Sequence, residues 1–166
     1  MKRFLWISAL LLTIMLFAGA LLASQFKLSA LPEPSKAETL LATKARRFLV
    51  RRASRVDSRS VPPSTAASIA EGDKLFGTDC SECHGNSGRK PTDAGRWMYP
   101  RAADLGSADV QQYSDGELFW IVKNGIRLSG MPAFGRVESD ENIWNLVHFV
   151  RKLPKSENPK AEATTH

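Results

Sequence analysis

The only two cysteines of the chain and one of its three histidines lie within five residues, Cys80-Ser81-Glu82-Cys83-His84. The pattern Cys-x-x-Cys-His is typical of c-type haem attachment, in which both sulfurs bond to the porphyrin edge and the imidazole coordinates the iron. Two thiols three positions apart on a turning backbone project to the same side, and the next residue passes under the ring. We therefore predict that Cys80 and Cys83 anchor one haem and that His84 is an iron ligand.

A thioredoxin-like redox pair and half of a zinc site are the alternatives for two cysteines at this spacing. A zinc site needs two more ligands near the pair, and the sequence has no second cysteine pair to supply them. A redox pair is expected at the start of a helix in a βαβ unit, and the surrounding sequence has no such pattern. Haem attachment is the favoured interpretation.

A haem held by one histidine leaves the sixth coordination position of the iron to be filled, and Met131 is the best candidate. It lies in the Gly- and Pro-rich segment 125–135, which suits neither a helix nor a strand. Pro132 restricts the backbone beside the thioether, so the segment can hold a weak ligand near the iron. The weaker alternatives are an open position and three other side chains: Met98, His148 and His166.

These residues resemble a known family. The motif at 80–85, the run Gly-Met-Pro-Ala-Phe at 130–134 and a C-terminal helix look like a class I cytochrome c domain. Other stretches are similar to the single-haem domains found with bacterial oxidases and dehydrogenases: Tyr99-Pro100-Arg101, 114–120 and 124–127. The resemblance covers residues 67–154. It implies one-electron transfer, with Cys80 and Cys83 as thioether anchors, His84 as proximal ligand and Met131 as distal ligand.

The resemblance also implies a contact for the proximal imidazole. In such domains a proline carbonyl after the haem motif accepts its hydrogen bond, and Pro91 is the nearest match by position. The haem propionates have candidates of their own, because Trp97, Tyr99 and Arg101 offer an indole, a phenol and a guanidinium. We choose Arg101, for which an ordinary surface role is the alternative. No constellation for acid, base or nucleophilic catalysis accompanies the haem, so we expect that the protein is not an enzyme.

The N-terminus begins with Lys2-Arg3 and continues as an apolar run from Phe4 to Ala23. At about 1.5 Å per residue such a helix is about 30 Å long and can cross a bilayer. A removed secretory signal is the alternative, because Ala18-Gly19-Ala20 is typical of a cleavage site. We favour a retained anchor. Either interpretation exports the chain, so we expect the haem domain in the bacterial periplasm, held at the cytoplasmic membrane or soluble after cleavage.

The segment 36–59 carries eight Lys and Arg residues against Glu38 and Asp57, so the net charge of +6 is concentrated there. Leu41, Phe48 and Leu49 recur at helical spacing among the arginines, which predicts a short basic amphipathic helix. A solvated helical or disordered spacer is the favoured interpretation of this segment, and contact with an anionic membrane surface or an acidic protein is the alternative. Nucleic acid is a poor candidate, because an exported chain would not meet it.

The predicted organisation has four parts: an anchor or signal at 1–26, a basic and partly helical linker at 27–66, the cytochrome c domain at 67–156 and a disordered tail at 157–166. The domain should be all-α, with short helices around one covalently bound haem. Capping boxes predict helix starts near Ile69 and after Ser114, and Ser139 caps the last helix, which ends at Pro154. Residues 85–107 should form an irregular loop.

Two aromatic predictions concern the core. The resemblance implies that Gly72 and Phe76 of the first domain helix lie opposite Leu146 and Phe149 of the last helix, with the glycine permitting close approach. Phe119 and Trp120 are candidates for the wall of the haem pocket, although filling of the core is the favoured explanation for one of them.

The predicted function is a membrane-tethered carrier that passes one electron at a time between a donor and an acceptor protein. The haem subunit of a larger respiratory or dehydrogenase complex is an alternative. A haem gas sensor or a small peroxidase is a further alternative, and it requires Met131 to leave the iron.

Overall fold

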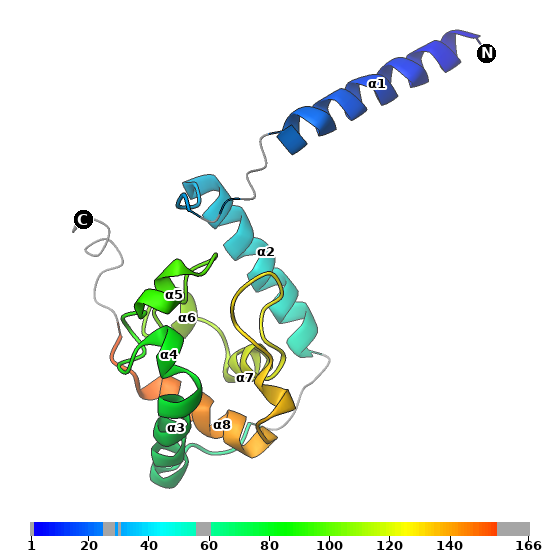
Figure 1. Ribbon diagram of the computed structural model, residues 1–166. Helices are drawn as coiled ribbons and strands as arrows, with labels where there is room; N and C mark the ends of the chain where they lie inside the picture. The colour runs from blue at the N-terminus through cyan, green and yellow to red at the C-terminus, as the bar shows by residue number, and fades with distance from the viewer. Residues whose placement is uncertain (1, 25–28, 30, 56–60, 156–166) are drawn as a thin grey trace. The chain divides into compact units, whose positions relative to one another are not determined.

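The computed structural model describes residues 2–24, 29, 31–55 and 61–155 (Figure 1). The chain divides into two compact units, residues 1–33 and 34–166. The described residues form helices and no strand, which confirms the predicted all-α fold.

α1 (Lys2–Ser24) is the helix of the first unit. Its large apolar side chains are exposed throughout, among them Leu10 and Phe17. Of the helices in the described part of the chain, α1 is long and apolar enough to cross a membrane, and a signal sequence meets the same criteria. The structure thus supports the predicted apolar helix and leaves both of its predicted roles open.

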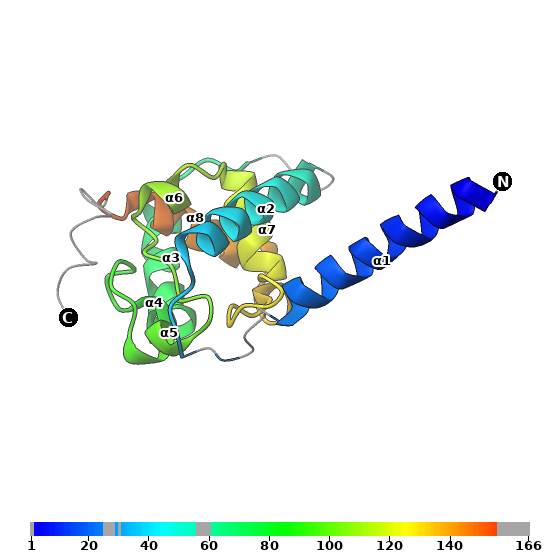
Figure 2. The same cartoon turned by 90° about the horizontal axis from the view of Figure 1, so that it is seen from above.

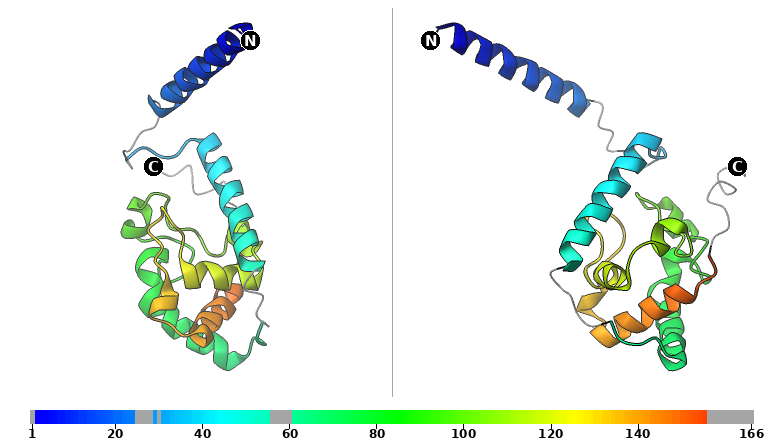
Figure 3. Two further views of the ribbon diagram at one scale, coloured as in Figure 1. Left: turned by 90° about the vertical axis from the view of Figure 1, so that its right-hand side faces the viewer. Right: turned by 180° about the vertical axis from the view of Figure 1, so that it is seen from behind.

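α2 (Lys36–Ser54) lies within the second unit, where it packs against α7 (Asp115–Asn124) (Figures 2 and 3). The helix begins after Ser35, whose side chain accepts a hydrogen bond of 3.2 Å from the backbone N–H of Glu38. Val50 of α2 is only 3% exposed and belongs to the hydrophobic core. We expected a linker over this segment, whereas in the structure α2 packs within the second unit.

α3 (Ala66–Asp79) crosses α8 (Asp140–Lys152) at the base of the second unit. Gly72 is buried at the crossing, with backbone atoms of Asn145 on its open side. One turn further along α3, the ring of Phe76 packs against the ring of Phe149 of α8, with the ring centroids 5.0 Å apart. The predicted contact of Gly72 and Phe76 with the last helix is confirmed at Phe149.

α3 begins three residues earlier than predicted. Thr65 is its N-cap: the Thr65 hydroxyl accepts a bond from the Ser68 N–H, and the Thr65 N–H donates to the Ser68 hydroxyl, each at 3.0 Å. Ser68 is therefore the third helical residue of the capping box rather than the cap itself. The other two predicted caps, Ser114 of α7 and Ser139 of α8, are confirmed.

Short helices carry the chain between these elements: α4 (Ser81–His84), α5 (Asp93–Trp97), α6 (Ala108–Gln111) and the 3₁₀ helix η2 (Phe134–Arg136). The prediction of an irregular loop over 85–107 missed α5. Thr92 is the N-cap of α5, since its hydroxyl accepts a hydrogen bond of 3.2 Å from the Gly95 N–H. Threonine is a common N-cap residue, so the start of α5 had a signal in the sequence.

Candidate haem site

A cavity of about 160 Å³ lies inside the second unit, and five of the six predicted site residues line it: Cys80, Cys83, His84, Arg101 and Met131. The sixth, Pro91, is not among the lining residues. Much of the remaining wall is apolar, with the following side chains: Phe76, Leu118, Ile121, Ile126, Leu146 and Val147. Such a wall excludes water from whatever binds there and strengthens electrostatic interactions inside.

The end of α3 and the whole of α4 set the position of the two cysteines. The backbone N–H groups of Cys83 and His84 both donate to the carbonyl of Cys80, at 3.2 and 2.9 Å. The two cysteines are not joined in a disulfide, and both are half-buried. Gly95 of α5 supports this turn closely, because a Cβ there would lie 2.1 Å from the carbonyl oxygen of Cys83.

The buried surroundings change the pKa of two groups in the motif. Burial raises the pKa of the Cys80 thiol to about 12, and the Asp79 carboxylate adds to the effect. Burial also lowers the pKa of His84, against the opposing effect of its backbone hydrogen bond. The imidazole is therefore neutral at pH 7, and the neutral form is the one that binds a metal ion.

The orientation of the His84 ring is set by a carbonyl group. Nδ1 lies 2.8 Å from the carbonyl oxygen of Ala103, and since a carbonyl only accepts, Nδ1 carries the proton and donates. This bond fixes the tautomer in which Nε2 has its lone pair free. We expected the carbonyl of Pro91 in this position, and the structure has Ala103 instead.

The Met131 loop is closed by its own backbone. The N–H of Ile126 donates to the carbonyl of Met131 at 3.3 Å, and the N–H of Met131 donates to the Ser129 hydroxyl at 3.2 Å. Gly125 has a φ of +67°, and a Cβ there would lie 2.7 Å from the backbone of Pro132. The half-buried Met131 side chain packs against the hydrophobic core.

Met98, the second choice for the sixth ligand, lines the same cavity. Its sulfur lies so close to Gly130 that a Cβ on this glycine would be 2.4 Å from it. The two candidate thioethers therefore share one wall, and the lining alone does not separate them.

The other candidates lie elsewhere. Trp97 is 79% exposed, and the hydroxyl of Tyr99 donates to the Glu38 carboxylate of α2. Phe119 is buried against Trp144, with ring centroids 4.5 Å apart. None of these side chains lines the cavity, and neither does Trp120, which packs against the hydrophobic core.

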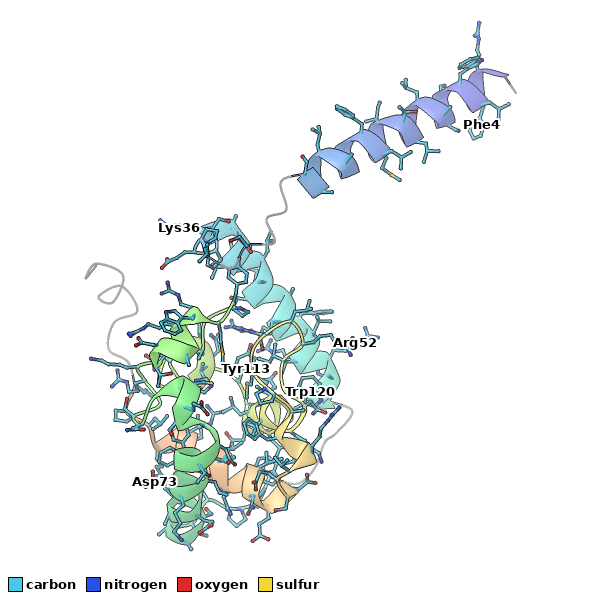
Figure 4. All side chains as sticks on the ribbon, viewed as in Figure 1. Phe4, Lys36, Arg52, Asp73, Tyr113 and Trp120 are labelled. Carbon is cyan, nitrogen blue, oxygen red and sulfur yellow. The ribbon has the colours of Figure 1, made fainter. Side chains whose placement is uncertain are left out.

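Among the polar residues of the wall, Arg46 of α2 and Tyr113 were not predicted. Tyr113 precedes α7 (Figure 4). Arg46 was visible only as one of several arginines in the basic segment. Tyr113 had no distinguishing signal, because its burial depends on the packing of α2 and α7 around it.

The residues of the cavity fit a covalently attached haem. Two free thiols, a neutral imidazole and a thioether meet at one apolar wall, and these are the groups by which a c-type haem is attached and ligated. The zinc alternative lacks further ligands, because the described residues contain no group of three or more His, Cys, Asp or Glu side chains able to hold a metal ion.

Comparison with known families agrees with this site. The model of the family described as Cytochrome C oxidase, cbb3-type, subunit III matches residues 67–150, just over half of the chain. The chain therefore belongs to this family of c-type cytochrome domains. It is a haem protein whose haem c is bound covalently.

Two solved structures are similar to the chain. One, from the Kuenenia stuttgartiensis reducing HAO-like protein complex Kustc0457/Kustc0458, is 22% identical with a TM-score of 0.53, covers 58% of this chain and shares its fold. This chain spans about half of that protein, 48% of its length. The other, the KustC0563 c-type cytochrome, is 30% identical with a TM-score of 0.45. The match covers 51% of this chain and 98% of the KustC0563 chain. No curated protein matches the chain.

Proposed function

We propose that this protein is an exported, membrane-anchored carrier of single electrons, with its haem iron coordinated by His84 and Met131. The observation that supports this most is the common cavity of Cys80, Cys83, His84 and Met131. When bound, the haem supplies a one-electron Fe(III)/Fe(II) couple.

The residues around the iron are arranged to hold it rather than to transform a substrate. The Ala103 carbonyl orients the neutral imidazole of His84, and the closed loop from Gly125 holds the thioether of Met131. Ligation by His and Met raises the reduction potential of the iron. The apolar wall keeps water away, so little rearrangement accompanies each electron.

Redox proteins that donate and accept electrons are the proposed partners. A second candidate is a haem subunit of a larger oxidase or dehydrogenase complex, which the description of the family as an oxidase subunit supports. Purification in mild detergent separates the two: a carrier elutes alone, and a subunit elutes with other redox proteins.

α1 is the proposed anchor, which places the haem domain on the periplasmic side of the cytoplasmic membrane. The outer side chains of α2 support a second contact with that membrane. Leu41, Phe48 and Leu49 are exposed there, and so are Lys44 and Arg52. The eleven residues between α1 and α2 reach about 40 Å at most. We propose that this face lies on an anionic bilayer surface.

Optical spectra test the ligand assignment. The oxidised and reduced protein is compared with and without carbon monoxide, beside Met131→Ala and, as a matched control, Met98→Ala. A low-spin wild type that ignores carbon monoxide, with binding gained only in Met131→Ala, supports the proposal. Gain of binding only in Met98→Ala assigns the ligand to Met98. If the wild type itself binds carbon monoxide readily, the iron is open, and a sensor or peroxidase replaces the carrier.

A further inference from the structure

α2 lies outside the segment 67–150 that matches the family, yet it contributes Arg46 to the wall of the haem cavity. The side chains of α2 that are half or fully buried recur every three or four positions, at Thr43, Arg46, Arg47, Val50, Ala53 and Ser54. This helix therefore turns arginines, rather than its leucines, toward the rest of the unit.

The position of Arg46 is fixed by contacts on neighbouring turns of α2. The side chain of Arg47 makes a contact of 3.5 Å with Asp109, and its guanidinium lies 5.7 Å from the ring centroid of Tyr113. One turn further on, Nε of Arg51 lies 3.3 Å from the buried Glu117 carboxylate, and Val50 is in the core. Arg46 thus extends from a helix that is held in place, not from a loose segment.

Two groups of the cavity wall are buried without a hydrogen-bond partner in the described structure, the hydroxyl of Tyr113 and Oδ2 of Asp79. Tyr113 is 5% exposed, and its hydroxyl has no hydrogen-bond partner. Arg46 is half-buried and makes no hydrogen bond or ion pair with any described residue. A buried donor without an acceptor is costly, so native proteins rarely keep one. The Tyr113 hydroxyl and the Arg46 guanidinium can both donate, and an acceptor inside the cavity would satisfy the buried hydroxyl of Tyr113 and lie within the wall to which Arg46 belongs.

The haem brings such acceptors, because its two propionate side chains end in carboxylates. We propose that Arg46 and Tyr113 together bind a haem carboxylate, so that α2 completes the haem site; this inference rests on the haem assignment proposed above. The planar guanidinium suits two parallel bonds to a carboxylate, and the phenol adds a third donor. Arg101, the candidate chosen from the sequence, lines the same cavity and already has an interaction of its own.

The contact places a fixed positive charge beside the haem. It offsets the negative charge of the carboxylate, which otherwise stabilises the ferric state. Removal of Arg46 therefore lowers the reduction potential and shifts the equilibrium constant for reduction by a given donor by on the order of tenfold, the effect expected of one unit charge acting across a protein interior.

The experiment uses the full chain with haem attached. Midpoint potentials are measured by spectroelectrochemistry for the wild type, Arg46→Gln, Tyr113→Phe and the matched control Arg52→Gln, whose arginine is exposed on the outer side of α2. Resonance Raman spectra of the same proteins report the bending band of the propionates, which a merely structural role of Arg46 would not move.

For Arg46→Gln, the expected result is a lower potential and a shifted propionate band. For Tyr113→Phe, we expect the band shift, either alone or with a smaller drop in potential. Arg52→Gln should show neither change. The inference is overturned if the propionate band of Arg46→Gln and Tyr113→Phe equals that of the wild type. Should Arg46→Gln give little haem protein, Arg46→Lys is measured in its place. The spin state, read from the same spectra, tests the His84 and Met131 ligation separately.

Discussion

The backbone of Gly72 in α3 lies against that of Asn145 in α8: a Cβ at Gly72 would be 2.1 Å from the carbonyl oxygen of Asn145 and 2.9 Å from Cβ of Phe149. Backbone atoms cannot rotate out of the way. The two helices cross at this distance only because one of them has no side chain there.

Gly72→Ala should therefore lower the free energy of unfolding of the haem protein by roughly 1–3 kcal/mol, as overpacking of a close contact does. Urea unfolding followed by circular dichroism measures it. Gly77→Ala is the matched control in the same helix, since nothing lies within 4 Å of a Cβ there. The control should be neutral or slightly stabilised. Equal stability of the two variants would falsify this account of the crossing.

The place of α2 in the folded unit can be tested with two neighbouring residues. Val50 is 3% exposed and Leu49 is 60% exposed. Val50→Ala should cost about 1–3 kcal/mol, because it empties space in the core, and Leu49→Ala should change stability by less than about 0.5 kcal/mol. Urea midpoints give both values. A freely solvated spacer, in contrast, would make both substitutions neutral.

A pH titration tests the contact between Tyr99 and α2. The hydrogen bond to Glu38 raises the pKa of the Tyr99 phenol above its ordinary value of 10.0. Because the folded pKa lies above the unfolded one, the contact contributes fully below about pH 10 and is lost as the pH rises through the folded value. Glu38→Ala should lower the pKa of Tyr99 toward 10.0.

The measurement for Tyr99 is the difference in absorbance at about 295 nm, where ionised phenols absorb, with Tyr99→Phe as the reference that removes the contribution of every other group. An unchanged pKa in Glu38→Ala would show that the hydroxyl and the carboxylate do not meet in solution.

Binding to vesicles tests the outer face of α2. The chain without residues 1–24 should sediment with vesicles that contain anionic lipid and not with neutral ones, and replacing both Leu41 and Phe48 by Ser should abolish sedimentation. Lack of binding to either kind of vesicle argues for an acidic protein as the partner of this face, and equal binding by the Ser variant shows that charge alone is responsible.

The sequence predicted the elements whose signals are local. Ser114 and Ser139 begin their helices as expected, because a capping residue needs only neighbours three positions away. The haem motif and the Met131 loop were recognisable for the same reason, since residue type and spacing define them without knowledge of the rest of the fold. The contact of Gly72 and Phe76 with the last helix was implied by the resemblance to class I cytochrome c domains.

The acceptor for His84 was beyond such reasoning. Ala103 is nineteen positions from His84, and no feature of its own marks it out. Which carbonyl meets the imidazole depends on the path of the chain through 85–107, and this path is set by α5 packing on Cys83 through Gly95. Pro91 was chosen by position alone.

The contacts of α2 with the rest of the unit were not predicted. Leu41, Phe48 and Leu49 form the apolar face that the helical spacing predicted, and the structure leaves this face exposed. The buried side of the helix carries Arg46 and Arg47, and acidic residues on other elements pair with α2, Asp109 with Arg47 and Glu117 with Arg51. A pattern read within one helix contains no information about such partners.

The packing of α2 also matters for the choice of a shorter fragment of this protein and for its comparison with other sequences. A fragment begun at residue 67, where the family match starts, would lose Val50 and Arg51 and leave the Glu117 carboxylate and the ring of Tyr113 facing water. The smallest fragment that preserves the core begins near residue 34. Sequence comparison limited to the matched region therefore overlooks a helix on which the haem cavity depends.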